Sequence, residues 1–214
     1  MKNLGLLIGL WFSSAACVWS QVSVEIAFDQ DQFLPGEALP ITVRVTNRSG
    51  QPLKLGEEGW LHFNIETRDK KLVSKRGEAP VEEAFTLETS KRATVRVDVA
   101  PYFSVRDPGH YTITATVRIK EWNGQVTSEA KPFDIIHGSK LWEMEVGVPK
   151  APDATNRAPE MRRYTLHQAN YLRKQLMLYV QVTGTAGKIY KVFPVGPIIS
   201  FGQPEAQVDK HSNL

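Results

Sequence analysis

The chain has 214 residues, of which 42% are hydrophobic and 23% charged, an ordinary globular composition that excludes an intrinsically disordered protein. The formal net charge of +3 is spread along the length without a block of Lys and Arg, so nucleic acid is not an expected partner. Cys17 is the only cysteine, which excludes an intramolecular disulfide.

The amino terminus has the order of a secretory signal peptide: Lys2, then an apolar run over residues 4–12, then small residues. The apolar run is too short to span a membrane comfortably. We therefore expect residues 1–20 to be removed and the mature chain to begin near Gln21, with no transmembrane segment. A competing interpretation is a lipid anchor at Cys17, but a lipoprotein box requires Leu or a similar residue where Ser14 stands, so cleavage is favoured.

Alternation of apolar and polar residues predicts a series of strands in the first two thirds of the chain. Turn residues such as Gly, Pro, Asn and Asp separate these strands, and no segment between them has a helical pattern. Seven apolar residues at odd-numbered positions of three of these strands are expected to share one core. The strands are predicted over residues 22–28, 39–46, 60–66, 85–87, 92–99 and 110–120, with a short extended piece near Leu72; the shared core residues are Ile41, Val43, Val95, Val97, Tyr111, Ile113 and Val117.

The strand over residues 110–120 is followed by Asn123-Gly124, a pair that tolerates positive φ at both centres of a two-residue hairpin. The next strand is therefore expected to pair with it antiparallel. If Asn123 and Gly124 form the loop, Trp122 lies opposite Gln125 and Arg118 lies opposite Glu129.

Seven or eight short strands by His137 predict an all-β protein whose first domain, residues 21–137, is an antiparallel β-sandwich. The motif Asp107-x-Gly109-x-Tyr111 before a long strand resembles the tyrosine corner of immunoglobulin-like domains, which implies that the Tyr111 hydroxyl bonds to upstream backbone. The chain lacks the cysteine pair of antibody domains, and Ile113 stands where one cysteine would be.

Within the immunoglobulin-like class, two segments look like bacterial proteinase-inhibitor modules of the BsuPI type: residues 47–53, Asn-Arg-Ser-Gly-Gln-Pro-Leu, and residues 108–111, Pro-Gly-His-Tyr. This likeness implies inhibition of a proteinase as one function. The segment of residues 68–72, Arg-Asp-Lys-Lys-Leu, departs from that pattern because it lacks the glycine expected in the middle hairpin.

Residues 138–214 form a smaller second β-rich unit, with a proline-containing loop at residues 149–163. Residues 176–182 are apolar at both odd- and even-numbered positions, which predicts a strand covered on both faces. Residues 162–172 allow either a strand through Tyr164 and Leu166 or a helix. Because about 75 residues without a disulfide are marginal alone, this unit either docks on the first or lacks part of its sheet.

The sequence contains no pattern of catalytic or ligand-binding residues. It has no Gly-x-Ser-x-Gly and no His-Glu-x-x-His, so we expect no enzyme, no cofactor and no metal site. His62 and His110 are predicted to lie at opposite ends of one sheet, too far apart to share a metal. Asp29, Asp31 and Glu37 lack the longer ligand series of a calcium loop and are interpreted as a solvated turn.

Trp60 and Trp122 fall on strand positions whose side chains should face away from the core, at one end of the same predicted sheet. Exposed tryptophans beside a turn suit contact with a protein or a glycan, so the candidate partner contact consists of Trp60, Trp122, Asn123 and Gly124. The alternative is that both tryptophans cap the sandwich or contact the second domain.

These observations together predict an exported, non-catalytic binding module of bacterial immunoglobulin-like type, located in the periplasm, at the cell surface or outside the cell. The alternatives are a proteinase inhibitor of BsuPI-like type and an accessory part of an enzyme whose active site is not recognisable here. The sequence does not identify the partner.

Overall fold

The computed structural model of the chain describes residues 21–79, 84–148, 160–171 and 175–199, together with 202, 204, 206 and 207. The predicted signal peptide and Cys17 lie outside these residues. Antiparallel strands dominate the described structure and only short 3-10 helices interrupt them, which confirms the all-β prediction. No helix in these ranges is long and apolar enough to cross a membrane.

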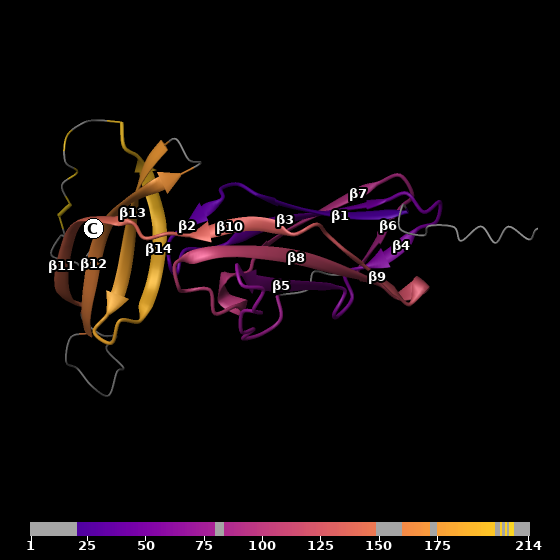
Figure 1. Ribbon diagram of the computed structural model, residues 1–214, viewed down its shortest axis with the longest axis horizontal. Coiled ribbons are helices and arrows are strands. Elements are labelled where there is room, and N and C mark those ends of the chain that lie inside the picture. The colour runs from indigo at the N-terminus through magenta and orange to yellow at the C-terminus, as the bar shows by residue number, and fades with distance from the viewer. Residues whose placement is uncertain are drawn as a thin grey trace, which may run out of the picture.

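The first unit is a sandwich of two sheets (Figure 1). One sheet has the order β1-β3-β7 and the other the order β2-β10-β8-β5, with β9 paired to β8; a short sheet of β4 and β6 lies beside them. The strands are β1 (Val22–Phe28), β2 (Gln32–Phe33), β3 (Pro40–Asn47), β4 (Leu53–Leu55), β5 (Leu61–Thr67), β6 (Phe85–Leu87), β7 (Arg92–Asp98), β8 (Gly109–Ile119), β9 (Gly124–Thr127) and β10 (Lys131–Ile135), with 3-10 helices η2 (Ala100–Tyr102) and η3 (Lys120–Trp122).

The core lies between these two sheets. In β8, the side chains alternate between buried and more exposed positions from Tyr111 to Ile119, because one face of the strand meets the opposite sheet. All seven residues predicted to share a core belong to one buried cluster, so the parity assignment is confirmed: Ile41, Val43, Val95, Val97, Tyr111, Ile113 and Val117.

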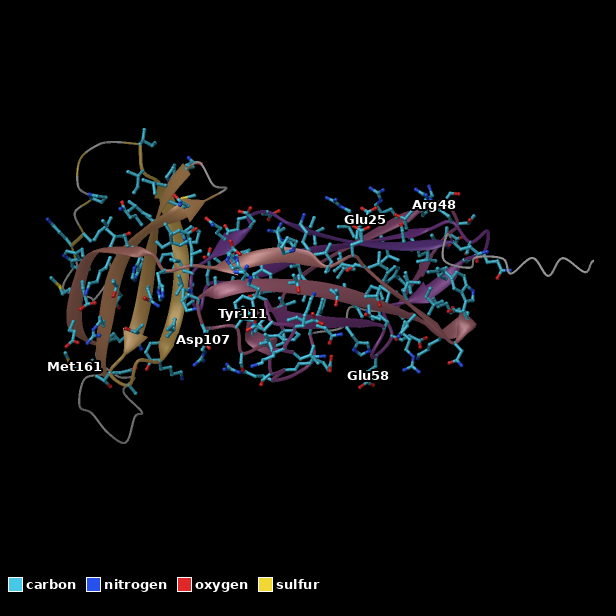
Figure 2. All side chains as sticks on the ribbon, viewed as in Figure 1. Glu25, Arg48, Glu58, Asp107, Tyr111 and Met161 are labelled. Carbon is cyan, nitrogen blue, oxygen red and sulfur yellow. The ribbon has the colours of Figure 1, made fainter. Side chains whose placement is uncertain are left out.

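Tyr111 fixes the segment that leads into β8. Its hydroxyl donates a hydrogen bond to the Asp107 carbonyl oxygen at 2.7 Å, upstream as the tyrosine-corner likeness implies. The ring stacks on Phe133, with 5.5 Å between ring centroids. Figure 2 shows Asp107 and Tyr111 at the end of the sandwich nearest the second sheet.

Asn47 ends β3 and is fully buried. Its Nδ2 donates to the Gln51 carbonyl oxygen at 2.7 Å and to the Leu87 carbonyl oxygen at 2.9 Å. Its Oδ1 accepts from the backbone N–H of Ser49 at 2.9 Å and from the Ser49 hydroxyl at 2.7 Å. Every polar atom of this buried amide is therefore satisfied, and the turn is tied to β6.

The second unit is one antiparallel sheet with the order β11-β12-β13-β14. Its strands are β11 (Ser139–Val148), β12 (Glu160–Tyr171), β13 (Gln175–Gly184) and β14 (Ile189–Pro197). Over residues 162–171 the strand alternative is confirmed and the helical one is wrong, since β12 continues to Tyr171 and pairs with strands on both sides. Residue 172 lies outside the described ranges.

The predicted loop at residues 149–163 is wrong at its end, because β12 already begins at Glu160; residues 149–159 lie outside the described ranges. In β13, the consecutive residues Tyr179 and Val180 are both buried, which confirms that the middle of this strand is covered on both faces.

The strands of the second sheet run across the long axis of the sandwich (Figure 1). β14 lies next to the sandwich and β11 lies farthest from it. A small apolar cluster joins the two units, with Leu34 from the sandwich and Ala169, Tyr179 and Val192 from the second sheet. The second sheet therefore gains part of its burial from the first unit.

Candidate functional site

The structure places Trp60 and Trp122 at the same end of one sheet, as expected. Leu61 pairs with Val117 across β5 and β8, and the Trp60 carbonyl oxygen accepts from the Arg118 backbone N–H at 2.7 Å. By the same register, His62 lies opposite Thr116 and His110 opposite Asp134, which separates the two histidines as predicted.

The expected exposure of Trp60 is wrong. Its side chain is 3% exposed and belongs to the sandwich core. The ring meets Phe85 of β6 edge to face, with 5.8 Å between centroids. The short sheet of β4 and β6 covers a position that strand parity alone turns outward. Trp122 is partly buried and packs against the same core.

The expected two-residue hairpin at Asn123 and Gly124 is also wrong. Lys120–Trp122 form η3, and Asn123 follows it with a φ of 45° in the left-handed region. The register is shifted from the expected one, because Arg118 lies opposite Gln125 and Ile119 opposite Gly124. The reason is that the 3-10 turn takes three residues out of the strand. A contact role for Trp122, Asn123 and Gly124 stays a prediction.

A different feature, the junction between the sandwich and the second sheet, brings polar and charged groups together. The turn after β2 carries Gly36, with a φ of 82°, and Glu37, which forms a parallel bridge with Val192 of β14. A Cβ on Gly36 would lie 2.8 Å from Cγ2 of Ile189. Only glycine therefore allows this close approach without a shift.

Glu37 is buried at the junction, and its carboxylate accepts hydrogen bonds from residues on both sides of β2. Oε2 accepts from the Leu34 backbone N–H at 2.8 Å and Oε1 accepts from Gln30 Nε2 at 3.0 Å. Burial raises the pKa of Glu37 above its ordinary value of 4.5, and these two hydrogen bonds oppose the rise. The residue belongs to the junction and not to the solvated calcium-like turn considered from the sequence.

Two hollows, each of about 340 Å³, lie beside Glu37. The first is a cleft between the sandwich and β14, which we call the junction cleft. Residues from both units line it, including Glu37, Arg76, Asp98, Arg106, Tyr190 and Lys191. Clefts of this size between two structural units are common positions for binding sites.

The junction cleft has an excess of positive charge. Arg76, Arg106 and Lys191 are exposed, and none of them forms an ion pair with a carboxylate in the described part of the chain. Asp98 is occupied by the backbone N–H groups of Leu39 and Ala100, at 2.8 and 3.1 Å. Arg76 Nε donates to the Ser104 hydroxyl at 2.8 Å, and the Lys191 ammonium lies 5.4 Å from the Phe193 ring centroid. The charges of these groups therefore have neutral partners and no carboxylate partner among the described residues.

Tyr190 forms the aromatic part of the same cleft. The residue is 45% exposed, and the Arg162 guanidinium and the Lys188 ammonium lie 5.4 Å and 5.3 Å from its ring centroid. Its hydroxyl donates to Glu160, and this bond is the main cause that raises the Tyr190 pKa. Sequence reasoning missed these residues because they are far apart in the chain and have no motif.

Among the residues with described positions, no group of His, Cys, Asp and Glu could hold a metal ion. His62 lies 3.5 Å from Glu78, and His110 lies 2.6 Å from Asp134. His62 and His110 therefore each have a separate carboxylate partner.

No protein-family model and no curated protein matches the chain. Among solved structures, the crystal structure of Spo0M, a sporulation control protein from Bacillus subtilis, matches 82% of this chain and 89% of that chain. The two chains are 11% identical and superpose with a TM-score of 0.33. A likeness at this level carries no inference about the present chain, so function has to be inferred from the chain's own geometry.

Proposed function

We propose that the chain is an exported, non-catalytic binding module, and that the junction cleft binds an acidic segment of a partner protein. The observation that carries the proposal is the excess of cationic side chains around the cleft without carboxylate partners. Export rests on the amino-terminal sequence alone.

A carboxylate-rich segment fits the chemistry of the cleft. Arginine guanidinium groups bind carboxylates through two parallel hydrogen bonds, and Arg76 and Arg106 supply two such groups from the sandwich. Lys191 supplies a cation from β14, across the cleft, so a bound segment would touch both units. The exposed ring of Tyr190 adds a rigid contact surface.

The test is binding of fluorescein-labelled hexaglutamate to the mature chain, followed by fluorescence anisotropy. Each exposed ion pair contributes up to about 1 kcal/mol, so Arg106→Ala with Lys191→Ala should weaken binding about five- to thirtyfold. Hexalysine should not bind, and added salt should weaken the complex.

Arg48→Ala with Arg44→Ala is the matched control, because both residues are exposed and lie on β3 or just after it. Figure 2 shows Arg48 at the end of the molecule opposite the second sheet. An equal loss of binding in this control would mean that hexaglutamate responds to total charge, which would contradict a site in the cleft.

A further inference from the structure

The start of β13 and the end of β14 form an exposed apolar corner of the second sheet. Leu176 in β13 is 43% exposed, Val195 in β14 is 59% exposed, and Ile199, just after β14, is 90% exposed. The Ile198 backbone N–H donates to the Leu176 carbonyl oxygen at 2.9 Å, so the two strand ends lie side by side. We call Leu176, Val195 and Ile199 the apolar corner.

The apolar corner protrudes from the surface. A side chain as exposed as Ile199 is not enclosed by neighbouring groups, whereas pockets for small ligands surround most of what they bind. A protruding apolar side chain can instead enter a soft apolar phase, such as the acyl boundary of a lipid bilayer. Large apolar side chains that are exposed together in this way indicate an interaction site.

Basic side chains accompany the apolar corner along β14. Residues 175–199 contain Lys188 and Lys191 but no Asp and no Glu. Both lysines are exposed, and neither forms an ion pair with a carboxylate among the residues whose positions are described. Their ammonium groups lie against aromatic rings, 5.3 Å from the ring centroid of Tyr190 and 5.4 Å from that of Phe193, respectively.

Two carboxylates that contact β14 do not cancel this positive charge. Glu37 forms a bridge with Val192 but is buried at the junction. Glu160 accepts a hydrogen bond from the Tyr190 hydroxyl and lies 3.3 Å from the Arg162 guanidinium, which balances its charge. The exposed side of β14 therefore combines aromatic and apolar side chains with an excess of positive charge.

We infer that the exposed side of β14 and the apolar corner bind the surface of an anionic phospholipid bilayer. The apolar corner enters the acyl boundary, while Lys188 and Lys191 lie among the phosphate headgroups. Aromatic side chains such as Tyr190 and Phe193 favour the level between these two layers. Each lysine close to an anionic membrane strengthens binding about fivefold. The surface thus offers a matching group to each layer of the membrane interface.

Two other occupants fit this surface less well. In a two-fold contact of the surface with itself, the lysines of both copies come together, and residues 175–199 supply no carboxylate to meet them. An acidic segment of a protein would satisfy the lysines, but it offers no apolar phase for the protruding Ile199. A bilayer supplies both the negative charge and the apolar phase.

The test is co-sedimentation of the mature, unacylated chain with lipid vesicles. We expect saturable binding to vesicles of phosphatidylcholine that contain about one third phosphatidylglycerol, and binding at least about fivefold weaker to phosphatidylcholine alone. Added salt should weaken binding to the anionic vesicles, because it screens the attraction between the lysines and the headgroups.

Ile199→Asp should weaken binding to the anionic vesicles at least about tenfold, because it replaces an inserted apolar side chain with a negative charge. Leu72→Asp is the matched control, since Leu72 is 70% exposed on the sandwich and undergoes the same change of charge. This control should bind like the wild type. Both variants should melt within a few degrees of the wild type, because both residues are exposed.

The charge of Lys188 is tested in the same way. Lys188→Glu should weaken binding to the anionic vesicles about five- to thirtyfold. Lys91→Glu is the control: Lys91 is exposed, and its carbonyl oxygen accepts from the Asn47 backbone N–H at 3.0 Å. Figure 2 shows Arg48, the residue after Asn47, at the end of the molecule opposite the second sheet.

The membrane surface and the junction cleft can be tested separately. Lys188 and the three residues of the apolar corner do not line the junction cleft, and Arg106 lines it from the sandwich. Arg106→Ala should therefore weaken binding of hexaglutamate and leave binding to vesicles unchanged. Ile199→Asp should have the opposite pattern.

The inference would be overturned if the wild type did not bind anionic vesicles, or if Ile199→Asp and Leu72→Asp lost binding equally. It would also be overturned by a wild-type dimer in sedimentation velocity that Ile199→Asp dissociates and that does not bind vesicles. That result would assign the apolar corner to a second copy of the chain.

Discussion

β8 of the sandwich and β13 of the second sheet are strands of similar length, but they bury their side chains in different ways. In β8, one complete face is buried because a second sheet lies against it. In β13, only the central Tyr179 and Val180 are buried, while both ends of the strand are more exposed. Strand pairing alone therefore does not make a core, because a core needs a second layer.

The largest effect should come from a charge in the layered core. Val97→Asp places a carboxylate at a position that is 6% exposed, and burial of an unpaired charge should cost about 5 kcal/mol. We expect the sandwich to unfold and the second sheet to lose its support at the same time. A urea melt followed by tryptophan fluorescence measures the loss.

Thr94→Asp is the control for this substitution. Thr94 is exposed on the same strand, β7, and lies opposite Arg44 of β3, so the new carboxylate should be tolerated. Equal losses from the two variants would contradict the assignment of buried and exposed faces in the sandwich.

The second largest effect should separate the two tryptophans. Trp60→Ala removes a fully packed ring and should lower the free energy of unfolding by about 3–5 kcal/mol. Trp122→Ala should cost clearly less, because its side chain is only partly buried. Differential scanning calorimetry of both variants makes the comparison, and a larger loss for Trp122 would show that η3 supports the sandwich more than the short β4–β6 sheet does.

A smaller effect is expected at the junction. Gly36→Ala introduces strain at a positive φ and a contact of 2.8 Å with Ile189, so it should loosen the second sheet from the sandwich. Gly50→Ala has nearly the same φ, 79°, but meets nothing within 4 Å. We expect about 1–2 kcal/mol of strain in both variants and a further 1–3 kcal/mol only in Gly36→Ala.

Hydrogen exchange distinguishes where the junction variant acts. Faster exchange in β13 and β14 with unchanged exchange in β8 is the expected result for Gly36→Ala. Equal stability of the two glycine variants would mean that the turn moves away from Ile189 without loss, and that the two units are held together elsewhere.

The smallest effect concerns Glu37 and pH. Because the folded-state pKa of Glu37 is raised by burial, the folded protein binds more protons than the unfolded chain above pH 4.5. This contribution to stability is present below the unfolded pKa and is lost as pH rises through the folded pKa. Glu37→Gln should therefore gain stability relative to wild type as pH rises from 4 to 7.

Urea melts at several pH values test this expectation, with Glu58→Gln as the control for removal of an exposed carboxylate. A constant difference between wild type and Glu37→Gln across this range would contradict a titrating Glu37 at the junction.

The strands of the sandwich could be predicted well because the alternation of apolar and polar residues can be seen within each strand. Each strand from β1 to β8 that alternates clearly in sequence appears within one or two residues of its predicted bounds, since a sheet with one covered face imposes a period of two. The tyrosine hydrogen bond to Asp107 was implied by five adjacent residues. Turn geometry was harder, because residues 120–122 fit both a strand and a 3-10 turn.

The candidate site could not be predicted for the opposite reason. Strand parity gave the face of Trp60, but it could not reveal that Phe85 from another sheet covers that face. The junction cleft joins Arg106 to Lys191 across 85 positions of sequence, and Glu37 to Val192 across 155. No periodicity or motif reports contacts between units that meet only after folding.

The hydrogen bonds of Asn47 have a consequence for producing this protein in eukaryotic cells. Asn47-Arg48-Ser49 has the pattern of an acceptor for N-linked glycosylation. In the folded chain both hydrogens of the Asn47 amide nitrogen are donated to the carbonyl oxygens of Gln51 and Leu87, and the side chain is fully buried. A glycosyltransferase could reach this nitrogen only before the sandwich closes, and an attached sugar would then keep β3 and β6 apart. Yeast or insect secretion should therefore yield folded protein without a glycan and a glycosylated fraction that fails to fold, and Asn47→Gln would not repair the loss because the longer side chain cannot keep all these hydrogen bonds.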